Sequence, residues 1–144
     1  MTYCHTGRCS CGEVSFEFQS PRDLPDQLPR QCDCDYCAAH GKPTLLSDPA
    51  GQLTVSSNRA LTIETQGSGQ VEMLFCPGCG NTLGACINID DQLIGVVNGR
   101  LLDEADRLPG AEIVSPKKLS PEEKRIRWLA IWTPAKFVQE ETSP

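Results

Sequence analysis

Short apolar stretches alternate with polar, proline-rich stretches along most of the chain, and their spacing is that of β-strands. In residues 13–18 (EVSFEF), apolar and polar side chains alternate, which is typical of a strand with one buried face. The next stretch, residues 20–30, contains three prolines. We therefore expect an irregular connection there rather than a helix, because proline interrupts helical hydrogen bonding.

Six further stretches carry a strand signature, at residues 52–57, 60–65, 69–76, 82–89, 92–99 and 126–132. The first two are expected to form a hairpin, and the fourth and fifth to form another across an Asp-Asp turn. The last stretch, IRWLAIW, is interpreted as a final buried strand, after the first turn of a short helix at residues 120–125. The pattern thus predicts a mainly β fold of about seven antiparallel strands, with loops between them. Five large side chains are predicted to lie in its core: Phe16, Phe18, Phe75, Trp128 and Trp132.

Length and charge narrow the class of protein. The 144 residues suit one domain, and a hydrophobic content of 39% allows only a modest core, to which a structural metal would add stability. The net charge of −6 argues against nucleic acid or an anionic membrane as a partner. No apolar stretch is long enough to span a bilayer, and the first residues lack the apolar region of a signal peptide. A cytoplasmic location is therefore expected.

The nine cysteines are the strongest chemical signal. In a reducing compartment, clustered cysteines are more often metal ligands or redox groups than disulfides. Their odd number also fits a pure disulfide framework poorly. They fall into five groups along the chain: Cys4; Cys9 and Cys11; Cys32, Cys34 and Cys37; Cys76 and Cys79; Cys86.

Two of these groups predict a closed structural zinc site. Cys9 and Cys11 form a C-x-C motif, and Cys76 and Cys79 form a C-x-x-C motif with glycines inside and after it. Glycine lets the backbone bend so that two thiolates point at one metal ion. Four thiolates complete a tetrahedral zinc site, which would join the start of the chain to its middle.

The central triplet, Cys32, Cys34 and Cys37, predicts a second metal site of a different kind. Three protein ligands and one open position are typical of catalytic zinc. A fourth ligand would instead make the site structural, and an iron–sulfur or redox-thiol role is a further alternative. The candidates for a fourth ligand are His40, His5, Cys4 and Cys86. Small residues around His40 suggest a loop that turns away from the triplet, so we expect His40 not to close the site.

The segments GRCSCGEV, CDCDYC and FCPGCGNTL, in this order, resemble the glutathione-dependent formaldehyde-activating enzyme family, also called the centromere protein V family. The later segment VNGRLLDEADRLPGAEI is similar to that family as well, and the resemblance covers about residues 5–132 of a single domain, 1–144. It implies a β-tent fold and two zinc ions per chain. By motif, the C-x-C and C-x-x-C cysteines match the structural site, and the triplet matches the catalytic site.

The resemblance also implies a reaction. The family joins formaldehyde to glutathione to form S-hydroxymethylglutathione, which is a carbon–sulfur lyase reaction run in reverse. The partners implied are therefore a small-molecule thiol and an aldehyde, and nothing in the sequence indicates an oligomeric state. A metal ion with three thiolate ligands suits the activation of a substrate thiol as a nucleophile. The residues near the triplet that are able to move a proton are Asp33, Asp35, Tyr36 and His40.

Glutathione is an anion, so a basic residue is expected near the triplet. Arg30 and Lys42 flank the triplet in the sequence and are the candidates. Two other functions remain open at this point. One is a non-catalytic, zinc-stabilised binding module, and the other is a redox-responsive thiol protein.

Overall fold

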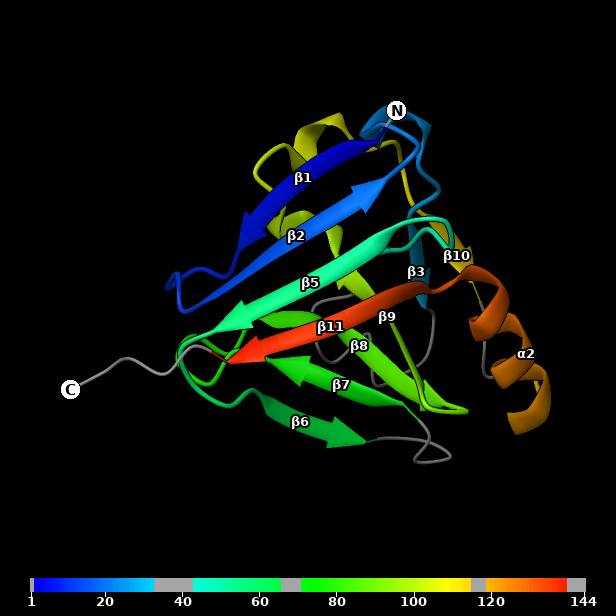
Figure 1. Cartoon of the computed structure of the whole chain (residues 1–144). Coiled ribbons are helices and arrows are strands. Elements are labelled where there is room, and N and C mark those ends of the chain that lie inside the picture. The colour runs from blue at the N-terminus through cyan, green and yellow to red at the C-terminus, as the bar shows by residue number, and fades with distance from the viewer. Residues whose placement is uncertain (1, 33–42, 66–70, 115–118, 140–144) are drawn as a thin grey trace.

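The computed structural model describes residues 2–32, 43–65, 71–114 and 119–139. Within these residues eleven strands join into a single, mostly antiparallel sheet, and one α-helix lies at its side (Figure 1). The mainly β class predicted from the sequence is confirmed. The described part of the chain contains no helix long and apolar enough to cross a membrane.

Four strands form the upper part of the sheet in Figure 1: β1 (Tyr3–Arg8), β2 (Val14–Ser20), β5 (Gln52–Ser57) and β11 (Thr133–Gln139). β2 pairs antiparallel with both β1 and β5. On its other edge, β5 pairs with β11 in the parallel direction. The alternation in β2 buries Val14, Phe16 and Phe18, as the pattern predicted.

Four more strands form the lower part: β6 (Thr62–Thr65), β7 (Glu72–Phe75), β8 (Thr82–Ile89) and β9 (Gln92–Asn98). The predicted hairpin of β8 and β9 is confirmed, and its turn residues Asp90 and Asp91 have φ of 52° and 65°. The predicted hairpin of β5 and β6 is wrong. β6 pairs with β7, whereas β5 lies between β2 and β11. Both edges of β5 are therefore taken by strands distant in sequence, which leaves no edge for β6.

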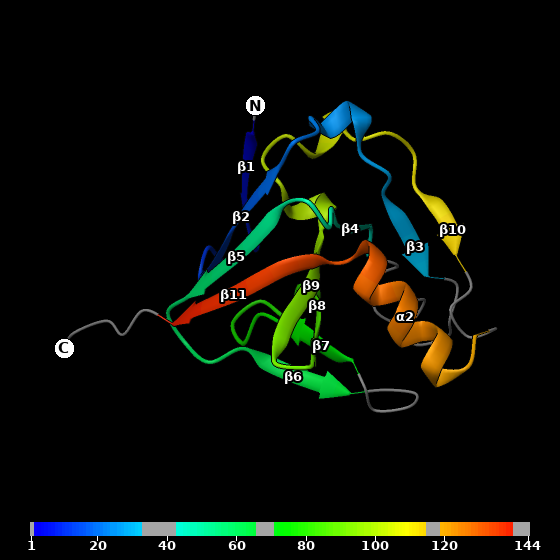
Figure 2. The same cartoon turned by 45° about the vertical axis from the view of Figure 1, so that its right-hand side comes forward.

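The sheet continues from β9 through three short strands: β4 (Leu45–Leu46), β3 (Arg30–Cys32) and β10 (Glu112–Val114). Three 3₁₀ turns support the connections: η1 (Leu24–Asp26), η2 (Gly99–Leu101) and η3 (Ala105–Arg107). Figure 2 shows β3 and β10 sloping down one side of the molecule and β2, β5 and β11 down the other, so the predicted tent shape is confirmed.

Residues 126–132, predicted as the final strand, lie mainly in helix α2 (Pro121–Ile131). Ser120 and Glu123 form a reciprocal capping box, and Pro121 occupies the first helical position. Both features stabilise the first turn of the helix. Its apolar residues are only partly buried: Trp128 is 9% exposed, but Ile126 is 64% exposed. A helix fits this composition, because it turns one side of an apolar run to solvent.

Two buried clusters form the core, and all five predicted core side chains belong to them. Phe16 and Phe18 lie in the cluster beneath β2 and β5. Phe75, Trp128 and Trp132 lie in the second cluster, where the two indole rings are 5.4 Å apart. The final strand is β11, whose Thr133 and Pro134 pair with β9 directly after the helix. The prediction of about seven strands missed β1, β3, β4, β10 and β11, which are short or polar in sequence.

Candidate metal centre

Two tight loops carry the cysteines of the C-x-C and C-x-x-C motifs. The first connects β1 to β2, and its Gly12 N–H donates to the Cys9 carbonyl at 3.1 Å. The second connects β7 to β8, and its Gly80 N–H donates to the Cys76 carbonyl at 3.0 Å. Gly12 and Gly80 have φ of +79° and +75°, a conformation that side chains with a Cβ rarely adopt. Both loops therefore turn sharply at glycine just after a cysteine.

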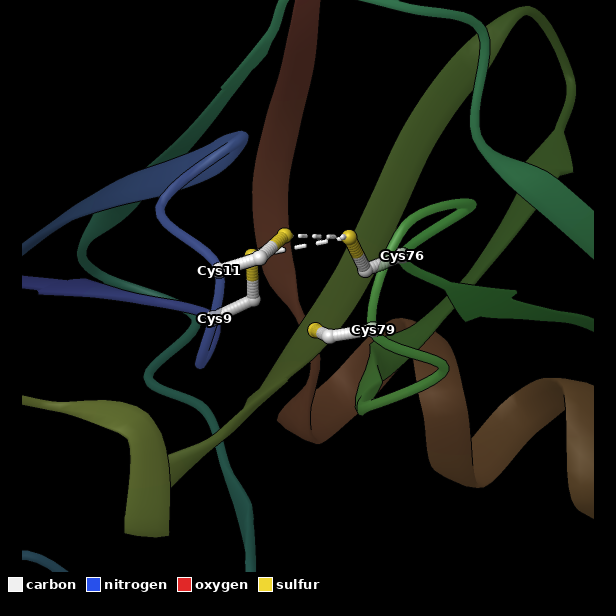
Figure 3. Close-up of side chains that lie close together, drawn as sticks. All are labelled: Cys9, Cys11, Cys76 and Cys79. Carbon is white, nitrogen blue, oxygen red and sulfur yellow. Dashed lines mark hydrogen bonds between the residues drawn. The ribbon is translucent and has the colours of Figure 1, made fainter.

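The turns bring together four thiols from two loops that are far apart in the sequence but adjacent in the fold (Figure 3). Cys9 and Cys11 lie 3.6 Å apart, and each lies 3.5 Å from Cys76, measured between sulfur atoms. With Cys79, all four sulfurs lie within 4.8 Å of one another. A tetrahedron of sulfurs about 2.3 Å from a zinc ion has edges of about 3.8 Å. The spacing and the donor set therefore fit one metal ion, and within the described residues this is the only such group.

Backbone amides also point at the sulfurs. Val14 N–H and Gly78 N–H donate to Cys9 Sγ and Cys76 Sγ, each at 3.4 Å. Burial raises the pKa of the Cys76 thiol to about 12. At Cys79 burial acts in the same direction, but amide hydrogen bonds from Asn81 and Cys11 outweigh it and lower the pKa to about 6. Thiolate is the form that binds metal, and amide donors stabilise it.

Asn81 joins the two loops from outside the cluster. Its Oδ1 accepts hydrogen bonds from the Ser10 N–H and the Ser10 hydroxyl, both at 2.7 Å, and lies 3.3 Å from Cys79 Sγ. Glu13 Oε2 lies 3.8 Å from Cys76 Sγ and pairs with Arg59 at 2.8 Å. Asn81 was not predicted from the sequence, although its position directly after the C-x-x-C-G turn was a usable signal.

We expect Asn81→Ala to weaken metal binding by the four-cysteine cluster about 10- to 100-fold, the range typical of losing a hydrogen-bond partner that orients a metal ligand. The reason is that the carboxamide oxygen of Asn81 contacts both loops and fixes the position of one relative to the other. Competition with a coloured chelator would measure the change. The matched control is Asn88→Ala, which should leave the affinity unchanged, because Asn88 is exposed near the end of β8, the strand that begins directly after Asn81. Equal affinities for both variants would contradict the role given to Asn81.

Cys32, the first cysteine of the triplet, is the last residue of β3 and is half-buried. It lines a cavity between β3 and helix α2, together with Arg30, Arg127 and Trp128. Cys34, Cys37 and His40 lie outside the described residues, and so do Asp33, Asp35, Tyr36 and Lys42. Whether the triplet forms a second metal site, and whether His40 closes it, therefore stay predictions.

The other residues considered as a fourth ligand have different surroundings. Cys86 is buried in β8 and lines a separate apolar cavity, and burial raises the pKa of its thiol to about 12. His5 is buried in β1, with its ring nitrogens 3.4 Å from Asp23 and 3.8 Å from Glu104. Cys4 is exposed on the same strand. None of these three lines the cavity that contains Cys32.

The fold and the four-cysteine cluster define a mainly β, tent-shaped domain whose two cysteine motifs can hold a metal ion. The model of the family described as glutathione-dependent formaldehyde-activating enzyme matches residues 4–117. The chain therefore belongs to this family, as the sequence motifs indicated.

A crystal structure of a protein from Rhodobacter sphaeroides shares the fold, with a TM-score of 0.57 and 23% sequence identity. The match covers 76% of this chain and 99% of that one. At this identity the likeness concerns the fold alone. No curated protein matches the chain at a significant level.

Proposed function

We propose that this protein is a zinc-dependent enzyme of the carbon–sulfur lyase type, which adds glutathione or a related thiol to formaldehyde or another small aldehyde. The observation that carries the proposal is the family match over residues 4–117, which includes all three cysteine motifs. The described start of the triplet supports it, because Cys32 lies at a cavity bordered by arginines. Arginine side chains beside Cys32 suit an anionic substrate, because guanidinium groups bind carboxylates.

Two zinc ions with different roles are proposed. Cys9, Cys11, Cys76 and Cys79 would hold the structural ion, because their sulfur spacing fits a tetrahedral site. Cys32, Cys34 and Cys37 would hold the catalytic ion. When bound, that ion supplies a positive charge beside which a substrate thiol loses its proton.

The reaction itself is an addition. The sulfur of the thiol forms a bond to the aldehyde carbon, the carbon–oxygen π bond breaks, and a proton reaches the oxygen. No oxidant and no leaving group are involved, so the product is a hemithioacetal. The protein's part is to hold the thiol and the aldehyde together and to exclude competing water, which shifts an otherwise bimolecular step toward a unimolecular one.

The test combines an assay with one substitution. The protein should speed the exchange between glutathione and its formaldehyde adduct above the buffer rate, as measured by exchange NMR. Cys32→Ser should return the exchange to the buffer rate and lower the zinc content from about two ions to about one. The far-ultraviolet circular dichroism should stay that of the folded protein, because the four-cysteine cluster is untouched.

Cys4→Ser is the matched control, because Cys4 is exposed and lies outside the four-cysteine cluster. We expect it to keep both the zinc content and the rate. A wild-type protein that leaves the exchange at the buffer rate would rule out this activity. Full activity in Cys32→Ser would rule out the triplet as its centre.

A further inference from the structure

A cavity of about 410 Å³ lies between the upper and lower parts of the sheet. Its lining residues come from β5 and β11 on one side and from β6, β7, β8 and β9 on the other, the strands that Figure 2 shows above and below one another. The cavity shares no lining residue with the one at Cys32, and none of the four clustered cysteines borders it. We call it the tent cavity, and the residues that matter below are Val55, Ala60, Glu72, Leu74, Cys86 and Phe137.

The pairing of β11 explains why the cavity is there. Thr133 and Pro134 pair with β9, whereas the pairing of residues 135–139 is with β5. Beyond Pro134 the two parts of the sheet therefore separate, and side chains rather than backbone hydrogen bonds face each other across the space. The topology of the sheet thus creates the tent cavity.

Apolar side chains make up most of the wall. Val55 and Leu74 are buried and line the cavity from β5 and β7. Phe137 on β11 is in register with Val55, so its ring is on the same face of the sheet, and yet it is 37% exposed. Ile63 and Val138, which also line the cavity, are 53% and 39% exposed. Large apolar side chains that remain exposed around a concave space are typical of a ligand site.

The tent cavity is large enough for a small organic molecule. Its volume of about 410 Å³ falls within the range of ligand pockets, about 300–1,000 Å³, and an apolar cavity of only about 150 Å³ binds benzene in another protein. The segments that follow β6 and β11 in the sequence, residues 66–70 (QGSGQ) and 140–144 (EETSP), contain no large apolar side chain. Neither of them therefore supplies apolar groups to fill the cavity.

One carboxylate borders this apolar space. Glu72 lines the cavity from the start of β7, is exposed, and has no ion-pair partner among the residues that the structure describes. It is in register with Cys86 on β8, so the two side chains share one face of the sheet. Burial, together with the charge of Glu72, raises the pKa of the Cys86 thiol to about 12, so the thiol is neutral at neutral pH. Glu72 is thus the only charged lining residue, and it is complementary to a cation.

We propose that the tent cavity is a second ligand site, which binds a small apolar amine with its rings against Leu74 and Phe137 and its ammonium group at the Glu72 carboxylate. The site is independent of the triplet and of the proposed thiol chemistry. A bound amine would contact both β7 and β11, which are not paired with each other, so binding should raise the melting temperature. Apolar anions should be poor ligands, because Glu72 and the net charge of −6 repel them.

The test uses three ligands that share one ring system and differ in charge: 2-naphthylmethylamine, 2-naphthylmethanol and 2-naphthoate. Calorimetric titration of the zinc-loaded protein would compare their affinities. We expect the amine to bind about threefold to fivefold more tightly than the alcohol, the scale of a solvent-exposed ion pair, and the naphthoate to bind most weakly. The preference for the amine should shrink in high salt.

Two substitutions locate the effect. Glu72→Gln should lower the affinity for the amine to that for the alcohol and leave the alcohol unchanged. Glu112→Gln is the matched control, because Glu112 is an exposed carboxylate on β10 that does not line the cavity, and it should bind all three ligands as the wild type does. Ala60→Trp adds a large side chain at an exposed position of the wall. It should weaken the binding of the amine and of the alcohol at least about tenfold, because the indole takes up space that the rings need.

Methyl NMR spectra give an independent location, since the amine should shift the signals of Val55 and Leu74. The inference would be overturned by equal affinities for the three ligands, by equal losses in Glu72→Gln and Glu112→Gln, by shifts that spare both methyl-bearing residues, or by no binding of the amine at millimolar concentration. Sedimentation tests a second copy of the chain as the occupant. A dimer that Ala60→Trp disrupts and that the amine leaves intact would also overturn the inference. None of these measurements depends on the thiol–aldehyde exchange, so the result stands apart from that of the proposed function.

Discussion

Cys76→Ser should leave the chain largely unfolded at room temperature. Cys76 is buried and its sulfur lies 3.5 Å from those of both Cys9 and Cys11, so its replacement leaves the cluster with three of its four thiols. Structural zinc sites contribute about 10–16 kcal/mol of binding free energy, whereas a typical domain is stable by only about 5–15 kcal/mol in total. We therefore expect the folded state to be stable only when the metal ion is bound.

Thermal unfolding and elemental analysis would measure this effect. The wild type should lose its cooperative transition when a strong chelator removes the metal, and Cys76→Ser should lack that transition from the start. Cys86→Ala is the matched control, because Cys86 is equally buried but is not part of the cluster. It should keep the zinc content and unfold only slightly earlier. A folded Cys76→Ser protein with unchanged zinc content would show that the cluster binds no metal.

Trp132→Ala should destabilise the fold by about 3–5 kcal/mol, the usual cost of emptying a buried aromatic site. Trp132 ends helix α2, and its ring packs 5.4 Å from that of Trp128 against the core cluster beneath β8 and β9. The melting temperature should fall by about 10 °C or more.

Leu129→Ala on the same helix provides the comparison for Trp132→Ala. Leu129 is 44% exposed, so its truncation should cost less than about 1 kcal/mol. Urea titrations of both variants would give the two free energies of unfolding. Similar values for the two variants would mean that the tryptophan pair does not anchor the helix.

The sequence identified the parts of the fold that depend on local signals. The alternation in residues 13–18 marks β2, and the Asp90–Asp91 turn marks the β8–β9 hairpin, because each signal acts within a few residues. Residues 126–132 were misassigned because an apolar run of this length is compatible with either a strand or a helix. The capping box at Ser120 and Glu123 would have favoured the helix, since it specifies where one begins.

Elements defined by distant partners could not be predicted. β11 contains Pro134 and Lys136, which weaken its strand signal, and its place depends on parallel pairing with β5. The same holds for the sites. The cysteine motifs indicated the four-cysteine cluster, because the spacing within each motif can be seen in the sequence. Arg30 and Arg127, in contrast, come to line one cavity only after folding.

The position of β11 has a consequence for how the protein is made. Residues 133–139 lie between β5 on one side and β9 on the other. The last described strand therefore joins the two parts of the sheet. During synthesis, the edges of β5 and β9 stay unpaired until this strand has left the ribosome. Pairing between segments so distant in sequence is slow, and unpaired edges invite association with other chains. Early release of the nascent chain, before residue 133, should therefore yield aggregates rather than a smaller folded domain.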